Sequence, residues 1–242
     1  KAWECFTKAK QLRPSYVDPY NNLGYVLARM GKNDLAMVEL MEALKLDTHF
    51  IIARQNLGVL HQRRGELDKA LQELEQAVAE GPDFAPAHVE LAYLTLRQGD
   101  ANKALAIARR ASEIDPGSSR THNMLGMCWI QLHDYEEALA AFERAVALDD
   151  NFPEAHSNSG YALMMRGDLE RAAKELDRAT ELDPEFTDPY RFRGNLFLTK
   201  GDIARAIENY DRCLKLDSKA SGADEIRARL AFLSLVEKTR KK

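Results

Sequence analysis

Long hydrophobic runs are missing from this chain of 242 residues. No apolar stretch approaches the roughly 18 residues that a membrane-spanning helix needs, and no signal-peptide pattern is visible. We therefore expect no direct insertion into a membrane. We expect a soluble chain, and because it starts at Lys1 rather than at a methionine, whether it is a fragment of a longer protein is left open. Its compartment, cytoplasm or periplasm, is therefore left open.

Cysteine is scarce, and charge of one sign does not dominate. The three cysteines, Cys5, Cys128 and Cys213, lie far apart and are odd in number, which argues against a disulfide framework or a zinc site. The formal net charge of -4 gives no reason to expect a nucleic-acid partner. With 8 prolines, 13 glycines and 45% hydrophobic residues, the composition favours an ordered helical protein.

What the chain does have is a period of 34 residues. Small residues recur at this spacing in three columns, which indicates internal repeats. The first column is Gly24, Gly58, Ala92, Gly126, Gly160 and Gly194. The second is Ala36, Ala70, Ala104, Ala138, Ala172 and Ala206, and the third is Ala9, Ala43, Ala77, Ala111, Ala145, Ala179 and Cys213.

Each column has a physical explanation in a pair of packed helices. Glycine inside a helix costs about 1 kcal/mol relative to alanine, which is tolerated where a second helix must approach closely. The alanines are placed on that second helix and let the two backbones pack. Another glycine set ends the first helix in a left-handed cap: Gly31, Gly65, Gly99, Gly167 and Gly201. Four aspartates follow as caps of the second helix: Asp100, Asp134, Asp168 and Asp202.

These landmarks resemble the tetratricopeptide repeat over essentially the whole chain. The resemblance implies an all-α, right-handed superhelical solenoid of helix-turn-helix repeats. Six repeats fit, at 17–50, 51–84, 85–118, 119–152, 153–186 and 187–220. Residues 1–16 match only the second helix of a repeat, and residues 221–242 are expected to form a capping helix with a basic tail. The main departures are His133 at a hinge glycine, Ser159 and Arg193 at a usual leucine, and Thr48 and Asp150 at the terminal proline.

A search for chemistry finds no reactive centre. His88, His122 and His156 are in register, but neighbouring repeats hold equivalent residues about 8–10 Å apart, too far to share one zinc ion. We interpret them as fillers between helices. The glycines do not cluster into a phosphate-binding loop, and no catalytic triad signature is present. We therefore predict no enzymatic activity, no catalytic residues, no cofactor and no metal.

The resemblance also implies that the first helices line a concave groove that binds a protein or an extended peptide. On this basis the candidate binding residues are Asn21, Asn22, Tyr25, Arg29, Gln55, Asn56, Arg63, Glu90, Tyr93, Arg97, Asn123, Met127, Asn158, Tyr161, Arg191 and Asn195. Asparagine amides can hydrogen-bond a peptide backbone. Tyrosine and methionine offer apolar contact area, and the arginines would meet acidic groups. The alternative is that the Tyr and Met side chains only pack against neighbouring helices.

The sequence thus predicts a non-catalytic scaffold that binds a protein partner as part of an assembly complex. Two rival hypotheses are left open. The first is self-association, with residues 1–16 of one copy docking on another copy in a contact that can propagate. The second is that the chain is the substrate-targeting segment of a larger enzyme.

Overall fold

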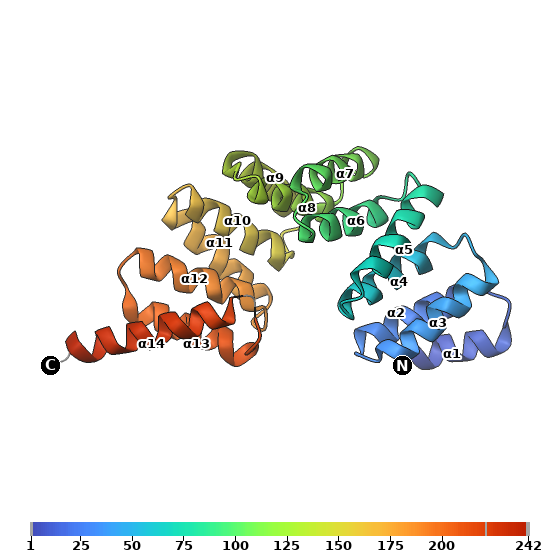
Figure 1. The fold of residues 1–242 in the computed structure, drawn as a ribbon, viewed down its shortest axis with the longest axis horizontal. Coiled ribbons are helices and arrows are strands. Elements are labelled where there is room, and N and C mark those ends of the chain that lie inside the picture. The colour runs from blue at the N-terminus through green and yellow to red at the C-terminus, as the bar shows by residue number, and fades with distance from the viewer. Residues whose placement is uncertain (1, 221, 241–242) are drawn as a thin grey trace. The chain divides into compact units, whose positions relative to one another are not determined.

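A computed structural model describes residues 2–220 and 222–240 of the chain (Figure 1). These residues form fourteen helices and no strand, which agrees with the predicted all-α fold. They divide into two compact units, one ending at Pro116 and one starting at Gly117. We call them unit 1 and unit 2 and describe each by itself. The unbroken 34-residue period did not predict this division.

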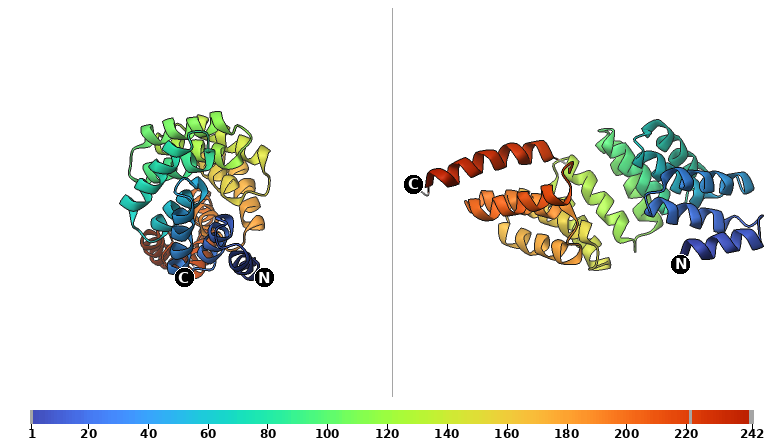
Figure 2. Two further views of the ribbon diagram at one scale, coloured as in Figure 1. Left: turned by 90° about the vertical axis from the view of Figure 1, so that its right-hand side faces the viewer. Right: turned by 90° about the horizontal axis from the view of Figure 1, so that it is seen from below.

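Both units consist of helix pairs. Unit 1 contains α1 (Ala2–Leu12), α2 (Asp18–Arg29), α3 (Asn33–Leu46), α4 (Ile51–Arg63), α5 (Leu67–Glu80), α6 (Ala85–Arg97) and α7 (Ala101–Ile114). Unit 2 contains α8 (Ser119–Gln131), α9 (Tyr135–Leu148), α10 (Pro153–Met165), α11 (Leu169–Leu182), α12 (Thr187–Thr199), α13 (Ile203–Leu216) and α14 (Ala223–Arg240). We call the even-numbered helices α2 to α12 the A helices and the odd-numbered helices the B helices. Each A helix packs on the B helix that follows it (Figures 1 and 2).

The glycine column lets a large side chain of the B helix lie against the A helix. A Cβ added at Gly58 would lie 2.8 Å from Leu74 Cγ, which is too close for a real contact. Gly24, Gly126, Gly160 and Gly194 meet Leu40, Phe142, Leu176 and Tyr210 in the same way. In the third pair both partners change together, because Ala92 replaces the glycine and Ala108 takes the place of the large residue. The pairing of small with large residues therefore holds A and B helices at close distance.

The predicted caps of the helices are present. The hinge glycines have positive φ angles, such as 77° at Gly65, and His133 adopts the same conformation with φ of 62°. Histidine is among the few other residues that tolerate this region. Asp100, Asp134, Asp168 and Asp202 each accept a hydrogen bond from the backbone N–H three residues further on. The turn inside each pair is thus fixed by local chemistry.

Four of the B helices end in an aspartate turn, which the sequence analysis did not predict. Asp47, Asp149, Asp183 and Asp217 each accept a hydrogen bond at Oδ1 from the backbone N–H two residues later, at 2.8–3.0 Å. Such aspartate turns compete with a continuing helix. α3 and α9 therefore stop at the usual place although Thr48 and Asp150 replace proline there.

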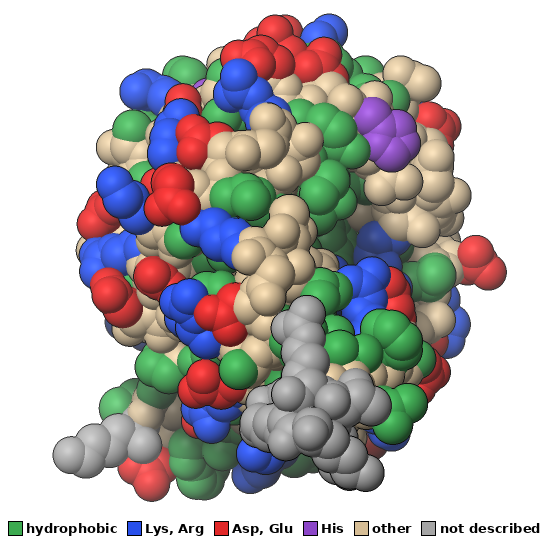
Figure 3. Space-filling model, turned by 90° about the vertical axis from the view of Figure 1, so that its left-hand side faces the viewer, with side chains coloured by type: hydrophobic (Ala, Val, Ile, Leu, Met, Phe, Trp, Pro, Cys, Tyr) green, Lys and Arg blue, Asp and Glu red, His purple; other side chains and the backbone are tan. Residues whose placement is uncertain are grey.

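The last helix, α14, covers the end of unit 2. Ile226 and Leu233 are each 3% exposed and join a cluster with Tyr210 and Cys213. Phe232 and Leu235 lie on the opposite side and are 66% and 63% exposed. Acidic and basic side chains are interspersed over the face of the molecule that Figure 3 shows. The expected basic tail falls on side chains outside the described ones.

Candidate protein-binding faces

In both units the A helices of successive pairs contact one another. α2 touches α4 and α4 touches α6 in unit 1, whereas α8 touches α10 and α10 touches α12 in unit 2. Within the described residues, successive B helices of a unit make no comparable contact. Helices that approach each other on one side only make the stack curve toward that side. The A helices therefore form the inner wall of each unit, where the candidate residues were expected.

Two asparagine pairs link neighbouring A helices. Asn56 Nδ2 donates to Asn21 Oδ1 at 2.8 Å in unit 1, and Asn158 Nδ2 donates to Asn123 Oδ1 at 2.9 Å in unit 2. Asn21 and Asn123 are 5% and 9% exposed, so both bonds are shielded. Each bond uses one of the two N–H groups on the donor amide. Asn56 and Asn158 thus hold repeats together, and the second amide N–H of each makes no hydrogen bond within the described residues.

The aromatic row differs between the units. Tyr25 in unit 1 is 51% exposed. Tyr161 in unit 2 stacks on Phe192, with the ring centroids 4.9 Å apart, and burial raises the pKa of its hydroxyl. Met127 is half-buried in the same cluster. Packing between helices, the alternative considered for these residues, therefore describes Tyr161 and Met127 better than it describes Tyr25.

The last turn of each A helix in unit 1 carries an exposed arginine: Arg29, Arg63 and Arg97. Among the described residues, none of the three has a hydrogen bond or an ion pair. The equivalent residues of unit 2 are Gln131, Met165 and Thr199. A row of three unpaired guanidinium groups is thus a property of unit 1 alone.

The remaining candidate binding residues are half-buried or already hydrogen-bonded to other side chains. Gln55 is half-buried, and Glu90 and Tyr93 are half-buried on α6. Asn22 accepts a bond from Asn21 Nδ2 at 3.3 Å. In unit 2, Arg191 binds Asp188 at 2.8 Å and stacks on Phe192. Asn195 accepts bonds from Tyr210 Oη at 2.6 Å and Arg229 at 3.1 Å. Asn195 therefore anchors the capping helix α14.

Comparison with known proteins gives the family. Models of the tetratricopeptide repeat match residues 61–128, 95–156 and 129–196, and another such model matches 17–50 and 190–219. The first model alone spans more than half of the chain. The chain belongs to the tetratricopeptide repeat family. No curated protein sequence matches it.

Solved structures agree on the fold. A chain of the APC/C hetero-tetramer Cut9–Hcn1 has a TM-score of 0.85 at 15% identity, over 95% of this chain and 45% of that one. The Pseudomonas aeruginosa protein pilF has a TM-score of 0.69 at 21% identity, over 88% of this chain and 96% of its own. YrrB, described as having an unusual peptide-binding site, gives 0.52 at 23% identity, over 78% and 97%. At these identities the likeness shows the fold alone, and this chain spans less than half of the first relative.

The tetratricopeptide fold is typically non-catalytic and serves as a protein-interaction scaffold. Within the described residues, no group of three His, Cys, Asp or Glu side chains could hold a metal ion. Burial raises the pKa of the Cys128 thiol to about 12, so this sulfur is a poor nucleophile. Over the same residues, no helix has the length and apolar content needed to cross a membrane.

Sequence reasoning missed a contact that recurs in this tetratricopeptide repeat protein. In four of the repeats the side chain at the fourth repeat position hydrogen-bonds the backbone carbonyl six residues earlier, in the turn before the A helix. Tyr20 binds Pro14 O, Arg54 binds Thr48 O, His156 binds Asp150 O and Tyr190 binds Pro184 O, at 2.6–3.2 Å. We call this contact the turn clasp. His156, one of the three in-register histidines that we interpreted as fillers between helices, therefore makes a turn clasp.

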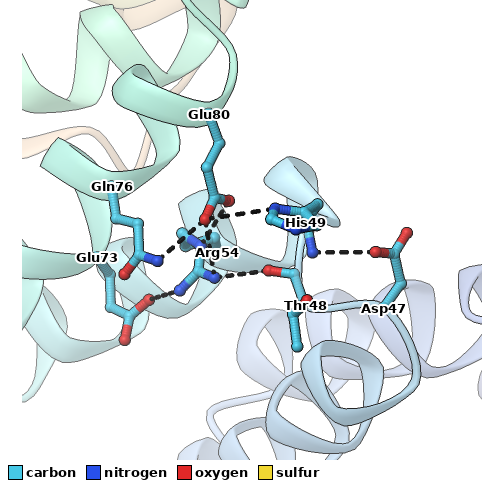
Figure 4. Close-up of polar contacts among 7 residues, drawn as sticks. All are labelled: Asp47, Thr48, His49, Arg54, Glu73, Gln76 and Glu80. Carbon is cyan, nitrogen blue, oxygen red and sulfur yellow. Dashed lines mark hydrogen bonds and ion pairs between the residues drawn. The ribbon is translucent and has the colours of Figure 1, made fainter.

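Arg54 and His156 extend the clasp to acidic groups. Arg54 is 9% exposed and also binds Glu73 and Glu80 at 3.1 Å (Figure 4). His156 Nδ1 lies 2.7 Å from Glu175 Oε2, which occupies the position equivalent to Glu73. Burial alone would lower the pKa of His156, but its bonds to Glu175 and the Asp150 carbonyl raise it overall. The same repeat position thus carries a permanent cation in unit 1, Arg54, and a titratable side chain in unit 2, His156.

Proposed function

We propose that the chain is a scaffold that holds an extended, acidic segment of a partner protein on the A helices of unit 1. The observation that carries the proposal is the row Arg29, Arg63 and Arg97, exposed and unpaired among the described residues. Exposed Tyr25 on α2 adds apolar contact area beside the first of them. This acidic segment is a specific form of the broader expectation that the chain binds a protein or peptide partner as part of an assembly complex.

The spacing of the arginines sets the pattern that a ligand should carry. Successive repeats place equivalent residues about 10 Å apart. A peptide in the extended polyproline II conformation advances about 3.1 Å per residue and completes one turn every three residues, so side chains three residues apart lie on the same side and about 9 Å from each other. A segment with an acidic side chain at every third residue would therefore match all three guanidinium groups. The free N–H of Asn56 is suited to a backbone carbonyl of the same segment.

A stabilising role at the helix end does not explain these arginines by itself. A cation in the last turn of a helix interacts favourably with the helix dipole, by about 0.3–1 kcal/mol. The A helices of unit 2 end at the same place with Gln131, Met165 and Thr199. The fold thus forms without arginine at these positions, and charge complementarity to a partner accounts for the row in unit 1.

The test uses two labelled ten-residue peptides and the whole chain. One peptide has Glu at every third position with Ser and Thr between, and the other has Gln in place of each Glu. We expect fluorescence anisotropy to show tighter binding of the Glu peptide, weakening as salt is added. Arg29→Gln/Arg63→Gln/Arg97→Gln should weaken it by about tenfold, since each exposed pair contributes about 0.5 kcal/mol.

Arg144→Gln provides the matched control, because Arg144 is an exposed arginine on the B helix α9. It should leave the affinity unchanged. Equal binding of the Glu and Gln peptides, or an equal loss in the control, would reject the acidic segment. The description of YrrB as a protein with a peptide-binding site supports peptide binding by a related fold.

Self-association is a second candidate, favoured by α1. None of the described residues of α1 is buried, and Trp3 and Leu12 are 45% and 72% exposed. We infer that a second copy could cover these side chains. Sedimentation velocity over a hundredfold range of concentration should then show a growing dimer fraction that Trp3→Ser/Leu12→Ser removes. A monomer throughout the range would eliminate this candidate.

A further inference from the structure

A pocket of about 440 Å³ lies between α12 and α13 in unit 2. Four of its eight lining residues are cationic, namely Arg193, Arg205, Arg212 and Lys215, and one, Glu208, is acidic. The rings of Tyr190 and Phe197 complete much of the wall. Its volume falls in the range of about 300–1,000 Å³ that is typical of small-molecule sites.

The pocket faces away from the A-helix surface on which a protein segment is expected. Tyr190, Arg193 and Phe197 are spaced by three and four residues, so they form one stripe along α12. At 100° per residue, the groove candidates Arg191 and Asn195 lie on the other side of the same helix. A ligand in the pocket would therefore leave the groove free.

Two of the cations have no acidic partner among the described residues. Arg178, on α11, pairs with Asp150 at 3.0 Å. Arg212 is its equivalent 34 residues later, but it meets Pro184 in place of an aspartate. Its contacts are a bond of 3.5 Å to the Pro184 carbonyl and stacking on the Tyr190 ring at 5.8 Å. Lys215 has no hydrogen bond or ion pair within the described residues.

The other two cations are held in place as walls of the pocket. Arg193 stands where four earlier repeats have leucine, and it binds Asp177 at 3.2 Å and Thr180 at 3.3 Å. Its Nε is buried without a hydrogen-bond partner among the described residues. Arg205 pairs with Asp202, three residues earlier, at 2.5 Å and stacks on the Phe197 ring. The pocket thus gains a cation that no other repeat has at this position.

We propose that this pocket binds a small molecule that carries a phosphate group. A phosphate has about two negative charges and three terminal oxygens, and arginine and lysine are the side chains that recognise it. Arg212 and Lys215 supply two cations that form no ion pair within the described residues, with Arg193 and Arg205 beside them. A carboxylate, with one charge and two oxygens, would leave a cation unmatched. The rings of Tyr190 and Phe197 accommodate the organic part of the ligand.

The test measures binding of defined probes to the whole chain by calorimetry and by thermal unfolding. Phenyl phosphate should bind and raise the melting temperature relative to potassium chloride at equal ionic strength. Inorganic phosphate is a second probe that shows whether the organic part contributes. Benzoate has the same ring with a carboxylate and should bind at least about tenfold more weakly, because it offers fewer charge-assisted bonds.

Arg212→Gln/Lys215→Gln should weaken binding of phenyl phosphate by about tenfold or more. Arg144→Gln changes the equivalent arginine two repeats earlier, which lines no part of this pocket, and should have no effect. Both variants change exposed side chains, and circular dichroism checks their fold. Three outcomes would each overturn the proposal. The first is that phenyl phosphate stabilises the chain no more than chloride does. The second is that benzoate binds equally well, and the third is that the double variant keeps its affinity. Binding of the acidic peptide is independent of every one of these outcomes.

Discussion

Units 1 and 2 use one framework with different chemistry at a few positions. The bond from Asn56 to Asn21 in unit 1 recurs 102 residues later as the bond from Asn158 to Asn123. The turn clasp of Arg54 likewise recurs at His156. At the ends of the A helices, in contrast, unit 1 has three arginines and unit 2 has Gln131, Met165 and Thr199.

This comparison separates structural residues from candidates for recognition. A contact that recurs with the same geometry in both units holds neighbouring repeats together. A surface position that changes from arginine to a neutral residue, while the helix around it stays the same, does not hold the fold together. Specificity for a partner should therefore lie in the exposed last turns of the A helices rather than in the asparagine pairs.

The largest expected effect comes from removing the permanent cation of the turn clasp in unit 1. Arg54→Met keeps much of the side-chain volume but leaves Glu73 and the Thr48 carbonyl without their donor and removes the ion pair to Glu80, which keeps only its bond from Gln76 and its contact with His49. Breaking a shielded ion network in this way should lower the free energy of unfolding by about 3 kcal/mol. Urea denaturation followed by circular dichroism measures the loss.

Arg29→Gln is the control for this change, since Arg29 is exposed and unpaired among the described residues. It should shift the free energy of unfolding by no more than about 0.5 kcal/mol. A loss below about 1 kcal/mol in Arg54→Met would mean that the network of Figure 4 contributes little.

A transplant of the arginine row sharpens the comparison of the two units. Gln131→Arg/Met165→Arg/Thr199→Arg places three cations on exposed positions of unit 2. In a chain whose Arg29, Arg63 and Arg97 are changed to Gln, this triple change should restore binding of the Glu peptide by about tenfold. Anisotropy titration checks it. If the transplant restores no binding, unit 1 must contribute more than its arginines, with Tyr25 the first residue to test.

The asparagine pairs should behave alike in both units, with a smaller effect. Asn56→Ala and Asn158→Ala each leave the shielded Oδ1 of Asn21 or Asn123 without its donor. Each should lower the free energy of unfolding by about 1 kcal/mol. Asn102→Ala, on the exposed side of α7, is the control and should have little effect in urea denaturation. A stable Asn56→Ala chain that binds the Glu peptide poorly would instead assign Asn56 to the ligand.

Most of the framework could be predicted because it follows from backbone requirements. The hinge glycines adopt positive φ angles, the aspartates cap the B helices, and Gly58 is covered by Leu74. Each of these structural features requires one residue type at one repeat position, so the same residue recurring every 34 positions reveals it. The same reasoning gave the family and the helix pairs, which the family models confirm.

Other features stayed hidden because different residue types serve one purpose. Tyr20, Arg54 and His156 are three different residue types, yet each binds the backbone carbonyl six residues earlier. The role of Asn195 depends on Arg229 of the capping helix, which no repeat column contains. The boundary at Pro116 leaves no trace in the period. Residues that could bind a ligand share their column positions with residues that only pack, so the columns alone do not separate the two.

The smallest expected effect is a pH dependence confined to the clasp of unit 2. The folded-state pKa of His156 lies above its ordinary value, so its stabilisation is fully present below pH about 6.5 and is lost as the pH rises through the folded value. Urea midpoints should therefore fall between pH 6 and pH 8, by less than in Arg54→Met. His156→Gln keeps hydrogen-bonding capacity toward Glu175 and Asp150 but does not titrate, so its midpoint should change less over this range. An identical pH profile in both chains would show that protonated His156 contributes no stability, and that the two clasps differ in residue type alone.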